Sequence, residues 1–348
     1  MNRPLSTRLR RAAAGLLLAA LIPPALATIT TASAPAPSAS SPLVDGVSSR
    51  IADDAAMAFW YGDFDRLEAL YRSVRQSTEL VDGGTSRLQW FRKGLWRVYG
   101  RDDATDPYFA QLEALTHAWA SKRPNSALAQ LLYARALHAR AWSFRGGDYA
   151  DHVLPAAMKE FHRYIALEKE QLDRNASLLK NESTADIYLL MIGRTAVAPF
   201  DQMHALALDA LARNPADDSG FQELATASLP KWGGSADLFD AVAREAARRA
   251  RPGSGMAMYA FLYDDVSGDF PGDLFETSDV DWPTMRQGFR DWLARWPNRY
   301  MLNRFARDAC HAQDKPTTLE VLNQIGDQPL ERAWGNQFES CRRWAREP

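Results

Sequence analysis

The feature that most constrains the fold is the way short helical patterns are interrupted by joints rich in glycine or proline. From residue 49 onward, apolar residues recur with the period of a helix over runs of about 10 to 16 residues, and almost no segment alternates as a strand does. The joint at residues 229–235, Leu-Pro-Lys-Trp-Gly-Gly-Ser, ends one run and begins the next. This pattern predicts an all-α fold of helices packed on helices.

Each residue of this joint has a predicted structural role. We expect Pro230 to stop the preceding helix, Trp232 to cover the end of the hairpin, Gly233 and Gly234 to turn the chain, and Ser235 to cap the next helix. The joint is therefore interpreted as a structural motif.

Two further Gly-Gly pairs, at residues 83–84 and 146–147, precede Thr85 and Asp148, which are residue types preferred at helix N-caps. We therefore expect one helix to stop and another to start at all three pairs. A phosphate-binding loop would need Gly-Lys-Ser/Thr after its spacer, and no pair has that continuation. The glycines predict turns and not a nucleotide site.

Proline marks a second kind of joint. Pro124, Pro215 and Pro297 each follow a helix end that contains Arg or Lys, and each precedes or adjoins an Asn, Asp or Ser. Such closures are typical of tetratricopeptide-type hairpins, but the spacing of these prolines fits no fixed repeat. We expect a single domain over residues 49–348, built as an irregular, tetratricopeptide-like stack of α-hairpins.

The N-terminus has the pattern of a secretory signal. Arginines precede an apolar run over residues 12–21, and the Ala-Leu-Ala sequence at residues 25–27 fits a cleavage site. A membrane-anchoring helix is the alternative, but the run is shorter than the ~20 residues of a span, and Pro23 and Pro24 break it. We predict a cleaved signal peptide over residues 1–27, a periplasmic or secreted protein, and no transmembrane segment in the mature chain.

Residues 28–48 have a different composition. As far as residue 42, every residue except Ile29 is Ala, Ser, Thr or Pro, which cannot bury a core. This segment is predicted to be a disordered linker.

The chain has two cysteines, Cys310 and Cys341. An even count in an oxidising compartment favours a disulfide, and both cysteines follow apolar helical patterns, so that both can point inward. A bond would tie the last helix to the preceding hairpin and stabilise the fold by about 3 to 4 kcal/mol. Two buried free thiols are the alternative.

The residues that bind metals do not gather in the sequence. Three histidines have an acidic residue three or four positions away, namely Glu113 with His117, Asp201 with His204 and Asp308 with His311. Each pair supplies only two ligands, so we interpret them as solvated pairs on helix faces and predict no metal site.

Residues 264–281 contain seven acids and no basic residue. Their oxygens could bind calcium, but their spacing fits no calcium loop, so we interpret the segment as a surface loop and leave cation binding open. A Ser-x-x-Lys match at residues 177–180 lacks the companion motifs of penicillin-binding enzymes. The sequence therefore predicts no catalytic residue and no cofactor.

The eleven tryptophans allow two interpretations. Trp119 lies on an apolar stripe with leucines, and Trp344 follows Cys341 by three positions. We interpret most of them as packing residues between hairpins, because tryptophan is highly buried on average. Exposed platforms for a peptide or a carbohydrate are the alternative.

Several motifs together resemble those of a known family. They are residues 229–235, Leu274-Phe275 with Trp282 downstream, the Phe-Ala-Arg-Asp-Ala-Cys sequence at residues 305–310 with Asp314, Trp334, and Phe338-x-x-Cys341-x-x-Trp344. This set resembles the bacterial domain of unknown function numbered 4034, over most of the mature chain. The resemblance implies a tetratricopeptide-like helical fold and implies no activity.

These patterns lead to an expected function. The formal net charge of −2 and the absence of a basic stripe give no reason to expect a nucleic-acid partner. We expect a non-enzymatic scaffold of the bacterial envelope whose concave face holds a protein or peptide partner that the sequence does not identify. The alternative is an envelope protein, enzyme or carbohydrate-binding, that acts on peptidoglycan or another glycan.

Overall fold

The structure is a computed structural model that describes residues 46–100, 106–147, 150–251, 253–270 and 272–347. The predicted signal peptide, residues 1–27, lies outside the described residues, as does the predicted linker up to residue 45. The described residues belong to one compact unit.

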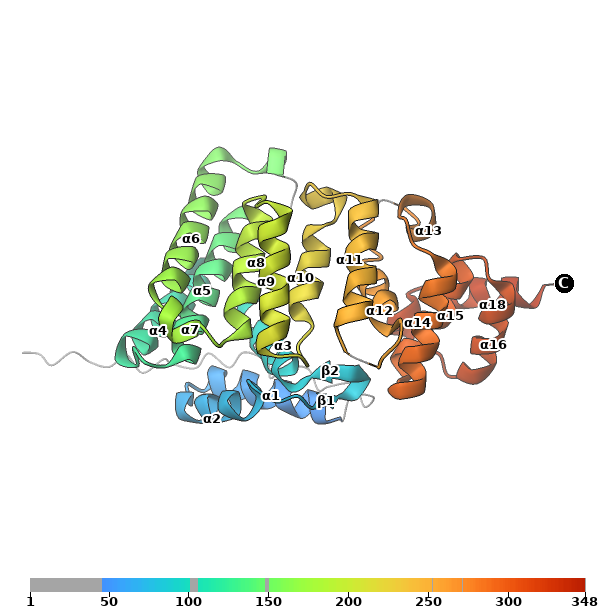
Figure 1. Cartoon of the computed structure of the whole chain (residues 1–348), viewed down its shortest axis with the longest axis horizontal. Helices are drawn as coiled ribbons and strands as arrows, with labels where there is room; N and C mark the ends of the chain where they lie inside the picture. The colour runs from blue at the N-terminus through green and yellow to red at the C-terminus, as the bar shows by residue number, and fades with distance from the viewer. Residues whose placement is uncertain (1–45, 101–105, 148–149, 252, 271, 348) are drawn as a thin grey trace, which may run out of the picture. The chain divides into compact units, whose positions relative to one another are not determined.

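The described chain is helical apart from one short β-hairpin (Figure 1). Its N-terminal elements are α1 (Val47–Trp60), α2 (Phe64–Val74), β1 (Leu80–Val81), β2 (Thr85–Ser86), α3 (Arg87–Tyr99), α4 (Asp106–Lys122), α5 (Ala127–Arg145), α6 (Pro155–Arg174), α7 (Ala176–Leu179), α8 (Ser183–Thr195) and α9 (Phe200–Arg213). They are followed by α10 (Ser219–Ala227), α11 (Ala236–Arg249), α12 (Ala257–Asp265), α13 (Leu274–Thr277), α14 (Trp282–Arg295), α15 (Arg299–His311), α16 (Lys315–Ile325), α17 (Glu331–Trp334) and α18 (Phe338–Arg346).

Helices that follow one another in the chain pack as hairpins. Such pairs are α4 with α5, α5 with α6, α8 with α9, α11 with α12, and α15 with α16, and two further close pairs, α1 with α3 and α12 with α14, join helices separated by one short helix. The helices range from 4 residues in α7 to 20 in α6, so the units are unequal, as the irregular spacing of the prolines predicts. The all-α prediction and the irregular stack of α-hairpins are confirmed. Across the described residues, no helix combines the length and the apolar character that a bilayer span requires.

Side-chain caps fix where several helices begin. Ser126 accepts a hydrogen bond from the Ala129 amide at the start of α5, and Asn298 accepts one from the Met301 amide at the start of α15. Each bond satisfies an amide that the first helical turn leaves without a partner. These two caps confirm that helices start after the Pro124 and Pro297 joints. The predicted cap Asp148 lies outside the described residues.

The prediction for the Gly-Gly pair at residues 83–84 is wrong. Thr85 lies in β2 and does not cap a helix; Ser86 caps α3 instead. Gly83 and Gly84 both have positive φ, at +73° and +76°, which lets β2 turn back and pair antiparallel with β1. An added Cβ on Gly84 would lie 2.7 Å from the ring of Trp296, so a residue just after α14, far along the chain, packs against this turn.

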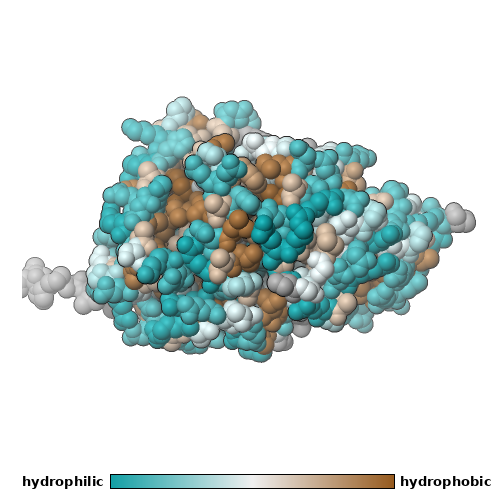
Figure 2. Space-filling view, viewed as in Figure 1, coloured by the Kyte–Doolittle hydropathy of each residue, from teal (hydrophilic) through white to brown (hydrophobic). Residues whose placement is uncertain are grey.

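The buried apolar side chains form two clusters. The N-terminal core runs from α1 to α8 and includes Ala210 of α9, whereas the C-terminal core runs from Leu190 of α8 to Ala345 of α18. The cores meet at α8 and α9. Figure 2 shows that one face carries apolar residues over α6 to α10 and is mainly hydrophilic over the helices that follow.

Candidate functional site

The joint at residues 229–235 is a tight turn between α10 and α11. Pro230 begins a one-turn 3₁₀ helix after the end of α10, and Gly233 follows it with a φ of +88°. Trp232 covers this end of the hairpin, with its ring centroid 6.3 Å from that of Trp142 and the Arg194 guanidinium 4.9 Å from the ring. The side chain predicted to cover the hairpin therefore also contacts α5 and α8.

Gly234 and Ser235 complete the turn. An added Cβ on Gly234 would lie 2.0 Å from the carbonyl oxygen of Ser228, so this position has no room for a side chain. Ser235 caps α11 by accepting a hydrogen bond of 3.3 Å from the Leu238 amide. The backbone amides of residues 232–235 all donate to carbonyl oxygens of residues 228–230, so the contacts of the joint are within the protein.

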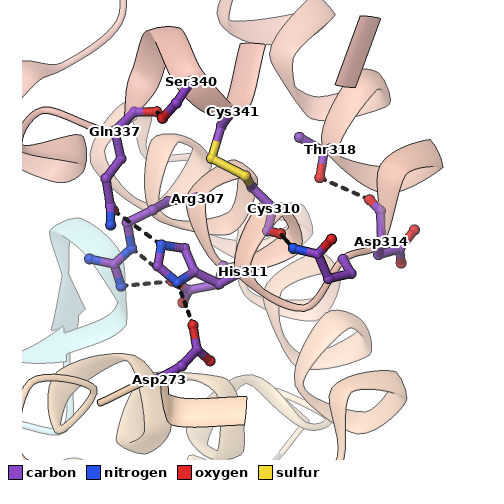
Figure 3. The surroundings of a disulfide bond; sticks show 11 residues. Asp273, Arg307, Cys310, His311, Asp314, Thr318, Gln337, Ser340 and Cys341 are labelled. Atoms are coloured by element: carbon purple, nitrogen blue, oxygen red, sulfur yellow. Dashed lines mark hydrogen bonds and ion pairs between the residues drawn. A yellow bond between two sulfur atoms is a disulfide. The ribbon is translucent and has the colours of Figure 1, made fainter. Parts of the chain in front are cut away.

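A disulfide joins Cys310 of α15 to Cys341 of α18, with 5.9 Å between the Cα atoms (Figure 3). Both cysteines are buried. The pairing is confirmed, and the alternative of two free thiols is wrong. The bond ties the last helix to the body of the C-terminal core.

The histidines singled out from the sequence have partners on other helices. Their contacts are His117 with the Tyr133 ring at 4.9 Å, His204 Nε2 with Glu245 Oε2 at 2.9 Å, and His311 Nδ1 with Asp273 Oδ2 at 2.9 Å. The pairing of His311 with Asp273 is visible in Figure 3. Helical spacing thus selected the wrong acidic partners, because it considers a single helix and ignores its neighbours.

The acids of residues 264–281 are dispersed among separate structural roles. Asp273 and Asp281 cap α13 and α14, and Asp269 pairs with a lysine across the surface. Asp264 is buried, against the expectation of a surface loop, and accepts a hydrogen bond of 2.6 Å from Arg304 Nε. Within the described residues, no three acids, histidines or cysteines converge to hold a metal.

A concave feature lies elsewhere, between α3, α4, α5 and α8. An outer hollow of about 590 Å³ opens there, and an inner hollow of about 70 Å³ extends toward the first turn of α10. Both hollows are lined by Trp96, Tyr99, Arg135 and Met191, so they meet at these four residues. We call the two hollows together the Arg135 groove.

Aromatic side chains form much of the wall of the groove. Tyr99 and Tyr188 are buried, Trp142 is half-buried, and Trp96 is 42% exposed at the groove. Such rings provide large contact surfaces with little conformational entropy to lose, which suits them to hold a ligand. The tryptophans thus divide into two groups, because Trp119 packs in the core as predicted whereas Trp96 is exposed at the groove.

Arg135 is buried at the point where the two hollows meet. Its residue exposure is 9%, and it forms no hydrogen bond or ion pair with any other described residue. Its Nη1 atom is fully buried without a partner. The guanidinium lies 5.5 Å from the Trp96 ring centroid and 5.8 Å from that of Tyr99. An unpaired buried charge is costly, and an anionic ligand would offset that cost.

A buried pair lies next to Arg135 on the same side of the groove. His138 Nδ1 is 2.8 Å from Glu168 Oε2, and His138 lines the outer hollow. Burial, then the neighbouring Arg135 and Arg194, lower the pKa of His138 well below its usual value. Burial raises the pKa of Glu168 well above its usual value, although Arg135 opposes this effect. Glu168 is directed at His138, and no hydrogen bond or ion pair joins it to Arg135.

The other cations of the groove differ in whether they are paired. Arg92 forms two hydrogen bonds with Asp217, of 2.7 and 2.8 Å, and Arg194 lies 3.6 Å from Glu223. Lys93 lines the inner hollow and forms no ion pair with any described residue. Burial lowers the pKa of Lys93, and nearby acids only partly oppose the shift. The inner hollow therefore has a second cation without an ion pair among the described residues, and its ammonium lies 4.6 Å from the Trp90 ring centroid.

The sequence of α5 explains how a charge comes to be buried there. Small and branched apolar residues surround the helix on every side, and nearly all of Leu128–Ala141 is buried. Arg135 and His138 lie within this apolar surface, so the packing of α5 buries them. Sequence reasoning missed both residues. The signal that could have revealed them was the presence of polar side chains in a helix that has no polar face.

Comparison with known proteins leaves the site to be interpreted from its own geometry. No family model, no curated protein and no solved structure matches this chain. The resemblance to the family numbered 4034 therefore stays a prediction.

Proposed function

We propose that this protein is a non-enzymatic binding protein of the bacterial envelope that holds a peptide segment in the Arg135 groove. The observation that carries the proposal is a buried arginine without a partner at the centre of an aromatic-lined groove. An outer hollow of about 590 Å³ falls within the range of ligand sites, and it can hold a few residues of a peptide.

The envelope location rests on two features of the chain. The N-terminal pattern predicts export, and the disulfide between Cys310 and Cys341 suits an oxidising compartment. A stack of α-hairpins related to tetratricopeptide proteins would place a peptide against helix faces, which is how such stacks bind their partners. We include this relationship in the proposal.

Binding can be measured with a pool of acetylated tetrapeptides of mixed sequence, titrated into the mature protein by calorimetry. The matched variants are Trp96→Ala, in the groove, and Trp60→Ala, at the end of α1. The two side chains are similarly exposed, at 42% and 45%. We expect Trp96→Ala to weaken binding about 10-fold or more, and Trp60→Ala to leave it unchanged. No binding by the wild type, or equal losses in both variants, would refute the proposal.

A second candidate function is the binding of an envelope glycan. The exposed ring of Trp96 favours it, because an aromatic face at a groove can stack on a sugar ring. Sedimentation of the protein with purified cell-wall sacculi separates the two candidates. A glycan-binding protein would sediment with the sacculi and lose that property in Trp96→Ala. A peptide-binding protein would stay in the supernatant.

A further inference from the structure

We infer that Arg135 binds the free C-terminal carboxylate of a peptide whose last residues lie in the outer hollow. This inference rests on the proposed function and specifies its ligand. Three features of the groove support it: the charge of Arg135, the space on either side of that residue, and the pairing of the nearby acids.

The first feature is the charge of Arg135. Buried arginines elsewhere in this part of the chain meet carboxylates: Arg92 binds Asp217 in a two-bond arrangement, and Arg140 lies 2.7 Å from Asp106. Arg135 is buried to a similar degree and has no such partner among the described residues. A planar guanidinium matches a carboxylate by two parallel hydrogen bonds. The missing partner is therefore best supplied by a ligand carboxylate.

The second feature is the space on either side of Arg135. The outer hollow has room for several residues, whereas the inner hollow of about 70 Å³ has room only for a small group. A chain that passed through the groove would need comparable space on both sides of the arginine. A chain that ends at Arg135 needs space on one side only. The geometry thus favours a terminal carboxylate over the side chain of an internal acidic residue.

The third feature is the pairing of the acids that line the groove or lie next to it. Glu223 is paired with Arg194, and Asp217, next to the inner hollow, is paired with Arg92. Their charges are offset within the protein, whereas Arg135 and Lys93 remain without ion pairs among the described residues. The balance of charge where the hollows meet is therefore positive, which favours an anionic ligand.

Three matched peptide pools test the inference on the mature protein. The first contains acetylated tetrapeptides with a free carboxylate. The second contains the same sequences with an amidated C-terminus, and the third contains amidated sequences with one glutamate. We expect the free-acid pool to bind wild-type protein about 10- to 100-fold more tightly than either amidated pool.

Two variants assign that preference to a residue. Arg135→Met should bring the affinity for the free-acid pool down to that for the amidated pool, and leave the amidated pool unchanged. Arg97→Met removes a charge from the same helix as Trp96, at an exposed side chain outside the groove, and should keep the full preference. Circular dichroism establishes that each variant is folded.

The possible results separate this inference from the proposed function. If the free-acid and amidated pools bind equally well, the carboxylate inference is wrong and peptide binding stands. If the glutamate pool binds as well as the free-acid pool, the carboxylate comes from a side chain and the terminal assignment is wrong. If no pool binds, the proposed function itself fails. Because the first comparison uses wild-type protein, it does not depend on whether a variant folds.

Discussion

Two arginines of low exposure, one in each half of this protein, differ in whether they have a carboxylate partner. Arg304, next to the C-terminal core, donates to the carboxylate of Asp264 at 2.6 Å and to its backbone carbonyl at 2.9 Å. Arg135, in the N-terminal core, is buried at least as well and has no partner among the described residues. Arg135 thus differs from Arg304, and also from Arg92 and Arg140 of its own half, which pair with Asp217 and Asp106.

This difference extends beyond the arginines. The C-terminal half contains the disulfide, the capping acids of α13, α14 and α16, and the closely packed turn at Gly234. The N-terminal half contains the two hollows and the buried His138–Glu168 pair. Buried polar atoms without hydrogen-bond partners occur in both halves, for example in Arg135 and Glu168 of one half and in Trp232 and Asp308 of the other.

The largest expected effect comes from removing the two arginines in turn. Arg304→Met should cost about 3 to 5 kcal/mol in the free energy of unfolding, because it leaves buried carboxylates without their main partner. Arg135→Met should cost nothing or stabilise the fold, because no partner is left behind. Urea unfolding followed by circular dichroism measures both. A loss in Arg135→Met as large as that in Arg304→Met would remove the contrast between the two cores.

The disulfide is expected to have the next largest effect. Replacing Cys310 and Cys341 together by alanine should lower the free energy of unfolding by about 3 to 4 kcal/mol, because the bond closes a loop with a sequence separation of 31 residues. Peptide binding at the Arg135 groove should be unchanged, since the bond lies in the other half. A reducing agent serves as the control: it should lower the urea midpoint of the wild type and leave the double variant unaffected.

Two glycines that follow another glycine offer a smaller, matched comparison. Gly234→Ala should cost about 2 to 3 kcal/mol, because its Cβ would lie 2.0 Å from the Ser228 carbonyl oxygen. Gly147→Ala should change stability by less than about 0.5 kcal/mol, since no atom lies within 4 Å of its added Cβ. Thermal unfolding of the two variants checks this. Equal costs would show that the C-terminal turn is no tighter than the N-terminal one.

The smallest effect concerns the cap of α16. Burial acts to raise the pKa of Asp314, but hydrogen bonds from Trp282, Thr317 and Arg286 outweigh it and lower the pKa to about 2. The carboxylate therefore stabilises the fold at neutral pH, and this contribution is lost as the pH falls from about 4 through 2.

Asp314→Ala should accordingly cost about 1 to 2 kcal/mol at pH 7 and much less at pH 2. Urea unfolding at the two pH values provides the measurement. Asp63→Ala, at the exposed cap of α2, is the matched variant from the N-terminal half and should cost less, because Asp63 accepts a single local bond from the Arg66 amide. A pH-independent cost in Asp314→Ala would contradict the assigned role of its charge.

Local signals in the sequence were enough to predict most of the fold. Ser126, Ser235 and Asn298 begin helices because a side-chain cap depends only on the next three residues. The disulfide could also be predicted, since it needed only the compartment and the cysteine count. At Gly83 and Gly84 the prediction was wrong because the β-hairpin depends on Trp292 of α14 and on Trp296 just after it, which no local pattern reveals.

The candidate site could not be predicted by the same reasoning. Arg135 has significance only through what surrounds it, and its surroundings come from α3 and α8, some 40 to 60 positions away. A motif search looks for residues that act together at a fixed spacing. This candidate site is defined instead by a buried arginine that has no carboxylate partner. A missing partner is visible only when the whole neighbourhood has been assembled.

The contact between the β-hairpin and α14 has a consequence for the order of folding. Trp292 Nε1 donates a hydrogen bond of 2.9 Å to the Gly83 carbonyl, 209 positions earlier in the chain. In a stack whose units touch only their neighbours, whole units can be removed from one end without disturbing the other. Here the hairpin of β1 and β2 lacks part of its packing until α14 is present. A chain shortened before residue 292 would lack this hydrogen bond, so the β-hairpin cannot complete its packing before α14 has been synthesised.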